Sequence, residues 1–193
     1  LEGSIFIAGA GVQWLRDKIK FIKKAADTEK IIKSIKSNKG IYLVPAFTGL
    51  GAPYWEVNAR GILSGLTRDT GPKEIVRATV ESVAYQTHDL FEAMKNDGLR
   101  PKIIKVDGGM VKNNWFSQFL ADVVDIKVLR PKVDETTALG AAFMAGLQIG
   151  VYKSLKDISK NWQVDKSFHP RMKSTDRKNL IKGWNRAIKQ TLS

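Results

Sequence analysis

Short apolar segments alternate with helical segments between residues 41 and 149, and this alternation constrains the fold more than any other feature. The apolar segments are predicted strands because they are compact and are bounded by turn residues. They cover residues 41–44, 61–66, 102–106 and 127–129. The helical segments begin at Pro72, at Asn113 or Asn114, and at Thr136 or Thr137. This order predicts an α/β fold in which helices cover a sheet.

The segment after Pro72 has the clearest helical pattern in the chain. Proline suits the first turn of a helix, and the run Asn96-Asp97-Gly98 is typical of a helix end. Six residues spaced by three or four positions predict one buried stripe: Val76, Val80, Val83, Thr87, Leu90 and Met94. Glu81 and Tyr85 fall on the opposite side, which we expect to face away from the core.

The two ends of the chain give weaker patterns. Residues 4–9 are predicted to form a strand or strand end, and Thr28 is a candidate cap for a short helix. Only helical, basic segments are predicted beyond Gly150. We therefore expect a main domain over residues 1–150 and a helical extension over residues 151–193 that packs on it.

The chain has a formal net charge of +13, with 32 Lys and Arg against 19 Asp and Glu. Such an excess favours a phosphate-bearing partner or, more simply, a lysine-rich solvated surface. The lysines are scattered through helical segments and are not interleaved with aromatic residues, as a groove for single-stranded nucleic acid requires. We therefore expect no specific nucleic-acid partner.

Other classes of site and location have little support. There are no cysteines, and the two histidines, His88 and His169, lie far apart, so no metal site is expected. No apolar run approaches the roughly 18–20 residues of a membrane-spanning helix, so no membrane partner is expected. A reducing cytoplasm is the default compartment for a chain of this composition.

Two glycine turns that lead into helices are candidate ligand sites. The first contains Gly108, Gly109 and Asn113 after a predicted strand, and the second contains Gly9 and Gln13. Glycine allows a ligand to approach the backbone, and a helix N-terminus offers free N–H groups to a phosphate. Each turn by itself is more typical of a tight turn that binds nothing. Neither is a P-loop or a dinucleotide fingerprint, because the required Lys and third Gly are absent.

Residues 45–60 form a predicted loop that is rich in glycine, proline and aromatic residues. Loops of this length are often functional, but glycines also serve the turns of a loop that only packs. Composition does not decide between these two interpretations.

Several segments together resemble the FGGY family of carbohydrate kinases, which includes glycerol, xylulose and gluconate kinases. The segment GILSGL at residues 61–66 is followed after seven residues by EIVRATVE at residues 74–81, which is similar to the C-terminal signature of that family. Further similar segments are ESVAYQT at residues 81–87, VDGG at 106–109 and TALGAA at 137–142. QWLRD at residues 13–17 and PAFTGLGAPYW at 45–55 resemble the glycerol kinases within the family. The resemblance fades after about Lys153.

The resemblance implies an actin-like ATPase domain of the ribonuclease H-like class, with a mixed sheet, helices on both faces and its first strands lacking. ATP binds between two such domains in the family. Gly9 and Gln13 match positions near the phosphates and ribose, while Gly109 and Asn113 match contacts to the adenosine end. The helix after Thr136 is expected to pack closely against the sheet, and residues 45–60 to contribute to oligomer contacts.

The resemblance also implies what the chain does not supply. In the family, an N-terminal domain makes most of the contacts to glycerol and contains the aspartate that serves as general base. No catalytic residue is therefore expected here. The implied activity is phosphoryl transfer from ATP with Mg²⁺ to glycerol, giving glycerol 3-phosphate. The implied partners are ATP or ADP and the N-terminal half of the same enzyme. A homo-oligomer is also implied, so further copies of the same protein are expected partners. The alternatives are a kinase for a pentulose or other polyol, a non-catalytic nucleotide-binding module, and charge-driven nucleic-acid binding.

Overall fold

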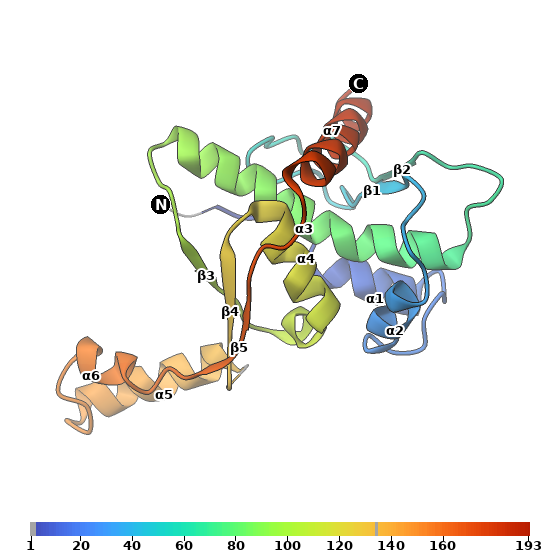
Figure 1. Cartoon of the computed structure of the whole chain (residues 1–193). Helices are drawn as coiled ribbons and strands as arrows, with labels where there is room; N and C mark the ends of the chain where they lie inside the picture. Colours follow the sequence, from blue (N-terminus) through green and yellow to red (C-terminus); the bar gives the residue numbers. More distant parts are fainter. Residues whose placement is uncertain (1–2, 134) are drawn as a thin grey trace.

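A computed structural model describes residues 3–133 and 135–193 (Figure 1). Helices and short strands alternate along these residues, as the sequence predicts. The helices are α1 (Gly9–Asp17), α2 (Asp27–Lys33), α3 (Pro72–Asn96), the short 3₁₀ helix η1 (Gly109–Lys112), α4 (Asn114–Val124), α5 (Thr136–Gln148), α6 (Leu155–Ser159) and α7 (Ser174–Thr191). The strands are β1 (Tyr42–Val44), β2 (Ile62–Ser64), β3 (Ile103–Lys105), β4 (Lys127–Pro131) and β5 (Val164–Phe168). None of the described helices is both long and apolar enough to cross a membrane.

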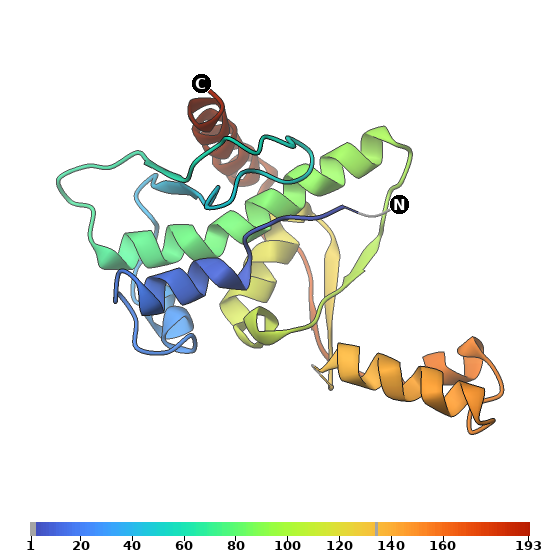
Figure 2. The same cartoon turned by 180° about the vertical axis from the view of Figure 1, so that it is seen from behind.

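Helix α3 is the centre of the body, and α1, α2, α4 and β1 all pack against it (Figures 1 and 2). It begins at Pro72, where the Glu74 carboxylate accepts the backbone N–H of Gly71 at 3.1 Å. It ends at Asn96, and Gly98 follows with a φ of +89°, which an L side chain adopts only with strain. The start and end predicted from the sequence are therefore confirmed.

Glu81 and Tyr85 are both 1% exposed, so the prediction that their side of α3 faces away from the core is wrong. Tyr85 stacks on Trp184 of α7, with ring centroids 5.3 Å apart. Arg77, Tyr85 and Asn38 all donate hydrogen bonds to the Glu81 carboxylate. The middle of α3 is buried on nearly every side. Helices α2, α4 and α7 cover the faces of α3 that lie outside the predicted apolar stripe.

The strands form two small sheets. Strand β1 pairs with β2 in antiparallel fashion, while β3 and β4 are parallel and β4 and β5 antiparallel. Helix α4 connects β3 to β4, which is the usual way to join parallel neighbours. The larger sheet is thus mixed, and the molecule is a mixed α/β domain.

Residues 4–9 do not form the predicted strand, because no described strand lies beside them to complete a ladder. Their backbone is held by other partners. Ala52 donates its backbone N–H to the Ser4 carbonyl at 3.0 Å, and the Gln86 amide donates to the Ile7 carbonyl at 3.1 Å. Helix α1 then begins at Gly9, inside the predicted break.

Strand β5 corrects the prediction that only helices follow Gly150. Only Phe168 of its five residues is buried, so the strand has no apolar run that sequence patterning could detect. It forms because its backbone pairs with β4, from Val128 opposite Phe168 to Pro131 opposite Val164.

The segment between β4 and β5 forms a projecting arm, which we define as residues 136–163 and which contains α5 and α6. The arm extends away from the body in both views (Figures 1 and 2). Neither α5 nor α6 packs substantially on another described helix or strand. The prediction that the small-residue helix packs closely against the sheet is therefore wrong for the described residues.

Residues 45–60 are a packed loop on the body. Phe47 contacts Trp14 of α1 with ring centroids 5.2 Å apart, and the Tyr54 hydroxyl donates to Asp89 of α3 at 2.7 Å. Ala46, Leu50 and Ala59 are buried. These contacts give the loop a structural role, and its contribution to oligomer contacts stays a prediction.

Candidate functional site

The turn between β3 and α4 combines open glycines with a capped helix. Gly108 has a φ of +85°, which favours glycine, and Gly109 opens η1. Asn113 is the N-cap of α4, and its side-chain oxygen accepts the backbone N–H of Phe116 at 2.9 Å. One of the two predicted capping residues is therefore confirmed. The buried side chain of Val111 anchors the turn in the core.

Gly108 and Gly109 are open on the side where a side chain would project. A Cβ atom added to either residue would have no heavy atom from a more distant part of the chain within 4 Å. Their lack of a side chain is therefore not required by packing inside the chain. A glycine that nothing crowds leaves its backbone accessible to a ligand.

Helix α2 lies beside the start of α4. The Asn113 amide donates to the Thr28 hydroxyl at 3.3 Å, and the Asn114 backbone N–H donates to the Glu29 carboxylate at 3.3 Å. Thr28 is not the cap of α2 that the sequence suggested, because α2 begins one residue earlier at Asp27. Its hydroxyl donates instead to the Ala25 carbonyl at 2.7 Å. The structure thus adds Thr28 and Glu29 to the surroundings of Asn113.

Arg130, which sequence reasoning missed, fixes the turn from the other side. Its Nη1 donates to the Val111 carbonyl at 2.8 Å, while Nε and Nη2 donate to the Asp165 carboxylate at 2.8 and 2.7 Å. A planar guanidinium can hold both partners at once. The sequence has no local signal for this role, because only the parallel pairing of β3 and β4 in the structure brings Arg130, near the end of β4, to the turn that follows β3.

The second predicted turn is the N-terminus of α1. Gly9 is the first residue of this helix, and a Cβ atom added to it would have no atom from a more distant part of the chain within 4 Å. Gly11 is buried, and a Cβ atom added there would lie 3.1 Å from the Thr79 side chain. The N-cap, Ala8, has no side chain that can bind the free N–H groups of the first turn, and that turn contains no acid. These groups and the helix dipole favour an anion. Gln13, one turn further on, is exposed.

The two turns share one hydrophobic core. Val12 of α1 and Val111 of η1 both belong to the main cluster of buried side chains. Among the described residues, no hydrogen bond joins Gly9 or Gln13 to Gly109 or Asn113. The structure therefore presents the four predicted residues on two separate turns of one body, and a common ligand for both stays a prediction.

Buried ionisable groups occur near α3 rather than at either turn. Burial raises the pKa of Glu81 above its usual value, and the hydrogen bonds and charge from Arg77 oppose this shift. Burial and the neighbouring Glu81 charge raise the pKa of Tyr85. No cluster of three metal-ligating side chains occurs among residues 3–133 and 135–193.

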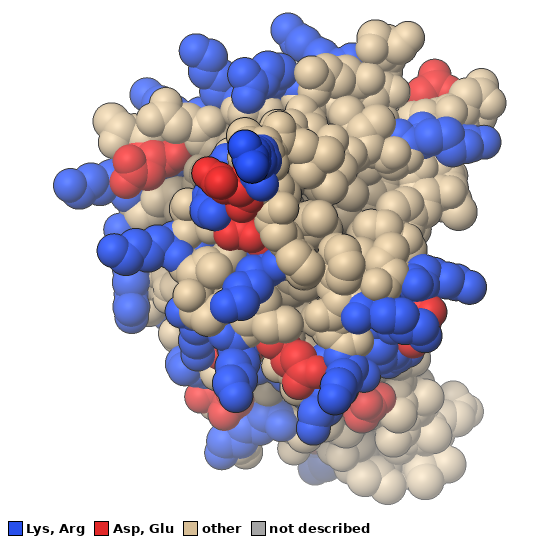
Figure 3. Space-filling model, turned by 90° about the vertical axis from the view of Figure 1, so that its right-hand side faces the viewer, with Lys and Arg blue, Asp and Glu red and all other residues tan. Residues whose placement is uncertain are grey.

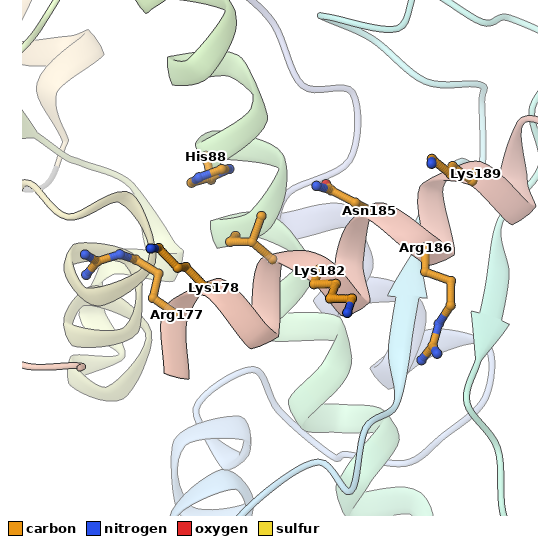
Figure 4. A pocket seen from close by; sticks show the side chains of 8 residues that line it. His88, Arg177, Lys178, Lys182, Asn185, Arg186 and Lys189 are labelled. Atoms are coloured by element: carbon orange, nitrogen blue, oxygen red, sulfur yellow. The ribbon is translucent and has the colours of Figure 1, made fainter. Parts of the chain in front are cut away.

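A basic groove lies between α3 and α7, with a volume of about 540 Å³. His88 lies on the α3 side, and the other labelled side chains come from α7 (Figure 4). Its lining residues are His88, Arg177, Lys178, Ile181, Lys182, Asn185, Arg186 and Lys189. None of the four predicted residues lines it. On the face shown in Figure 3, Lys and Arg are spread widely with Asp and Glu between them.

The chain matches known proteins over nearly all of its length. The model of the C-terminal domain of the FGGY family of carbohydrate kinases matches residues 1–149. The glycerol kinase of Ectopseudomonas mendocina is 56% identical over 194 aligned residues, which cover 100% of this chain and 39% of that protein. Glycerol kinase 1 of Pseudomonas aeruginosa is 54% identical over 193 residues, again 100% of this chain and 39% of that protein. The chain thus spans about two fifths of the length of these relatives.

Solved structures show the same fold. The crystal structure of Plasmodium falciparum glycerol kinase with ADP matches 98% of this chain and 38% of its own chain, with 37% identity and a TM-score of 0.88. A xylulose kinase from Lactobacillus acidophilus matches 97% of the chain with a TM-score of 0.80, and at 23% identity it shows the fold alone. A family match over most of the chain, with relatives above 50% identity and this shared fold, identifies the chain as a member of the FGGY family of carbohydrate kinases.

Proposed function

We propose that this chain is the nucleotide-binding part of a glycerol kinase, an enzyme that transfers the γ-phosphate of ATP to glycerol and gives glycerol 3-phosphate. One observation carries the proposal. The open turn from Gly108 to Asn113 leads into a capped helix in a chain that is 56% identical to a glycerol kinase. The matched structure of Plasmodium falciparum glycerol kinase contains ADP, which supports a nucleotide as the ligand.

In this proposal, the two glycine turns bind opposite ends of the nucleotide. Gly109 and Asn113 face the adenosine end, and Gly9 and Gln13 lie near the phosphates and ribose. The open space beside Gly9 and Gly109 fits a ligand that approaches the backbone closely. The uncapped N-terminus of α1 suits a phosphate because its N–H groups have no side-chain acceptor. Arg130 holds the first turn in position through the Val111 carbonyl.

Mg²⁺ would accompany ATP, since phosphoryl transfer needs the charge of the phosphates neutralised. The described residues do not fit a protein cage for this ion, because they contain no cluster of three acidic or histidine ligands. Magnesium often keeps most of its waters and is bound through substrate phosphates, so the chain needs no such cage. We assign no residue here to the ion.

In this proposal, the residues of this chain bind and orient the nucleotide. The part of the kinase outside this chain supplies the general base and the contacts to glycerol. Positioning is a large part of catalysis in phosphoryl transfer, so orienting the nucleotide is a substantial contribution. The remaining elements of the proposal are an actin-like, ribonuclease H-like class for the domain, a division at about Gly150, a homo-oligomer and a cytoplasmic location. The pairing of β4 with β5 supports a C-terminal part that packs on the same domain instead of one that folds apart from it.

A pentulose kinase is the second candidate, since xylulose kinases share the fold. Sequence identity favours glycerol: 56% to a glycerol kinase against 23% to a xylulose kinase. A non-catalytic module is the third candidate, and an activity measurement separates it from the other two.

The test uses a chimeric kinase in which this chain replaces the matching part of the Ectopseudomonas mendocina enzyme. We expect it to bind ADP in calorimetric titrations and to release ADP from ATP in the presence of glycerol but not of xylulose. We expect the chain alone to show no glycerol-dependent ADP release. A folded chimeric kinase that binds no nucleotide, or one that prefers xylulose, would contradict the proposal.

A further inference from the structure

Thr28 of α2 buries a hydroxyl group beside the candidate site. The residue is 3% exposed, and a buried hydroxyl costs free energy unless hydrogen bonds replace those it made to water. It donates to the Ala25 carbonyl at 2.7 Å and accepts from the Asn113 amide at 3.3 Å. Asn113 lies 85 residues later, at the start of α4. Thr28 therefore connects α2 directly to a residue of the proposed nucleotide site.

The two ends of the Asn113 amide are held by different partners. Its oxygen accepts the backbone N–H of Phe116 at 2.9 Å, which is the cap of α4. Its nitrogen donates to Thr28, whose single hydroxyl proton is directed to the Ala25 carbonyl. An amide turned by 180° would present its oxygen to a hydroxyl with no proton left, and its nitrogen to a backbone N–H. The contact with Thr28 thus fixes the direction in which the amide points.

One hydrogen of the Asn113 amide is left for a ligand. An amide nitrogen has two donor hydrogens, and within residues 3–133 and 135–193 Thr28 accepts one of them while no other group takes the second. Asn113 is partly exposed, and Gly109, earlier in the same turn, leaves open space where a side chain would project. The second hydrogen therefore requires a hydrogen-bond acceptor on the ligand.

Glu29, the next residue of α2, limits the charge of what this turn can receive. Its carboxylate accepts the backbone N–H of Asn114 at 3.3 Å and pairs with Lys33 on its own helix. A carboxylate at the start of α4 occupies the positive end of the helix dipole, and a phosphate would compete with it for the same N–H groups. The acceptor that faces the Asn113 amide therefore belongs to an uncharged part of the nucleotide, its base or its ribose.

We propose that Thr28 is a positioning residue of the nucleotide site: its hydroxyl holds the Asn113 amide so that the second amide hydrogen points to an acceptor on the nucleoside. This inference rests on the proposed function, because it assumes that Asn113 contacts the nucleoside end of ATP. Thr28 acts through Asn113 and does not touch the nucleotide. Its loss should therefore weaken one hydrogen bond to the nucleotide and leave the contacts to glycerol unchanged.

The first test compares three side chains at residue 28 of the chimeric kinase. Thr28→Val replaces the hydroxyl with a methyl group of similar size, and Thr28→Ser keeps the hydroxyl. We expect Thr28→Val to weaken ADP binding three- to tenfold in calorimetric titrations and to raise KM for ATP by a similar factor. The values of kcat and of KM for glycerol should stay within twofold. Thr28→Ser should bind ADP within twofold of the natural side chain, and equal losses in both variants would overturn the inference.

Thr87→Val is the matched control for the loss of a hydroxyl. The Thr87 hydroxyl also donates to a backbone carbonyl at 2.7 Å, that of Val83 on its own helix α3. We expect the valine variants at residues 28 and 87 to lower the melting temperature to a similar extent, and Thr87→Val to leave ADP affinity unchanged. An equal loss of ADP affinity in both variants would show a general effect of stability and would overturn the inference.

A double substitution tests whether Thr28 acts through Asn113. Asn113→Ser keeps an oxygen that can cap α4 and removes the amide nitrogen. We expect this substitution to weaken ADP binding, and the addition of Thr28→Val to weaken it less than twofold further, because the group that Thr28 holds is already gone. A full additional loss of three- to tenfold would show that Thr28 acts by another route and would overturn the inference.

The same measurements separate this inference from the proposed function. A folded chimeric kinase with the natural Thr28 that binds no ADP would contradict the proposed function and the inference with it. ADP binding that neither Gly109→Val nor Asn113→Ser weakens would do the same. ADP binding that Asn113→Ser weakens and Thr28→Val does not would overturn the positioning role alone.

Discussion

The indole N–H of Trp184 in α7 donates a 2.6 Å hydrogen bond to the carboxylate of Asp89, which lies 95 residues earlier on α3. The same carboxylate oxygen accepts the hydroxyl of Tyr54 at 2.7 Å. Trp184 is fully buried and Asp89 is 8% exposed. One acidic side chain thus joins the central helix, the loop of residues 45–60 and the C-terminal helix.

Asp89→Ala should lower the free energy of unfolding by about 2–4 kcal/mol, because it leaves the buried Trp184 N–H and the partly buried Tyr54 hydroxyl without their acceptor. Urea unfolding followed by fluorescence measures the change. Glu92→Ala is the control: Glu92 is on the same helix and pairs with Lys95 at the surface, where an ion pair contributes about 0–1 kcal/mol. Equal effects of the two substitutions would refute the assigned role of Asp89.

Gly109→Val should weaken ADP binding to the chimeric kinase at least tenfold, which corresponds to about 1.4 kcal/mol. The added side chain would occupy space that is open in the structure, so we expect the stability of the fold to change little. Calorimetric titration and thermal unfolding measure the two effects. Asn185→Val, at an exposed position on α7, is the control for added bulk. An unchanged ADP affinity would remove Gly109 from the proposed site.

Arg130→Lys should weaken ADP binding by about three- to tenfold, or roughly 0.7–1.4 kcal/mol. Lysine cannot hold the Val111 carbonyl and the Asp165 carboxylate together, so the turn would lose part of its support. Arg16→Lys provides the control, since the partner of Arg16 among the described residues is its exposed neighbour Asp17. If Arg130→Lys lowers stability and leaves ADP affinity intact, the residue has a structural role only.

Glu81 should give the protein a measurable pH dependence. Because burial raises its folded-state pKa, its contribution to stability is fully present below the usual pKa of 4.5 and is lost as the pH rises through the folded value. The difference in unfolding free energy between the natural chain and Glu81→Gln should therefore fall as the pH rises above 4.5. Urea unfolding at a series of pH values measures it, with Glu92→Gln as a control that should show no such trend. A difference that increases with pH would show that Arg77 and the other donors outweigh burial.

Local signals in the sequence predicted the parts of the fold that depend on local chemistry. Pro72 and Gly98 marked the limits of α3, and Asn113 marked the start of α4, because helix caps are encoded by residues at the ends themselves. The same signals led to both glycine turns of the candidate site. Their relevance to a nucleotide came from the family resemblance and not from the turns alone.

Features that depend on distant partners could not be predicted in this way. Glu81 is buried because other elements cover its side of α3, and its hydrogen-bond donor Asn38 is 43 residues away in sequence. Strand β5 forms because its backbone pairs with β4. Arg130 acts on a carbonyl 19 residues earlier in the chain. The composition of α5 did predict burial, but the described residues do not include a surface that covers it.

The bond between Asp89 and Trp184 also has a consequence for the order in which the protein is made. A ribosome adds about 5–20 residues per second, so roughly 5–20 s pass between the synthesis of the two residues. During this interval Asp89 lacks one of its donors, and β1 and β2 lack the helix that later packs against them. A nascent chain stalled before α7 should therefore be a target for chaperones and proteases, whereas one that has released α7 should resist them.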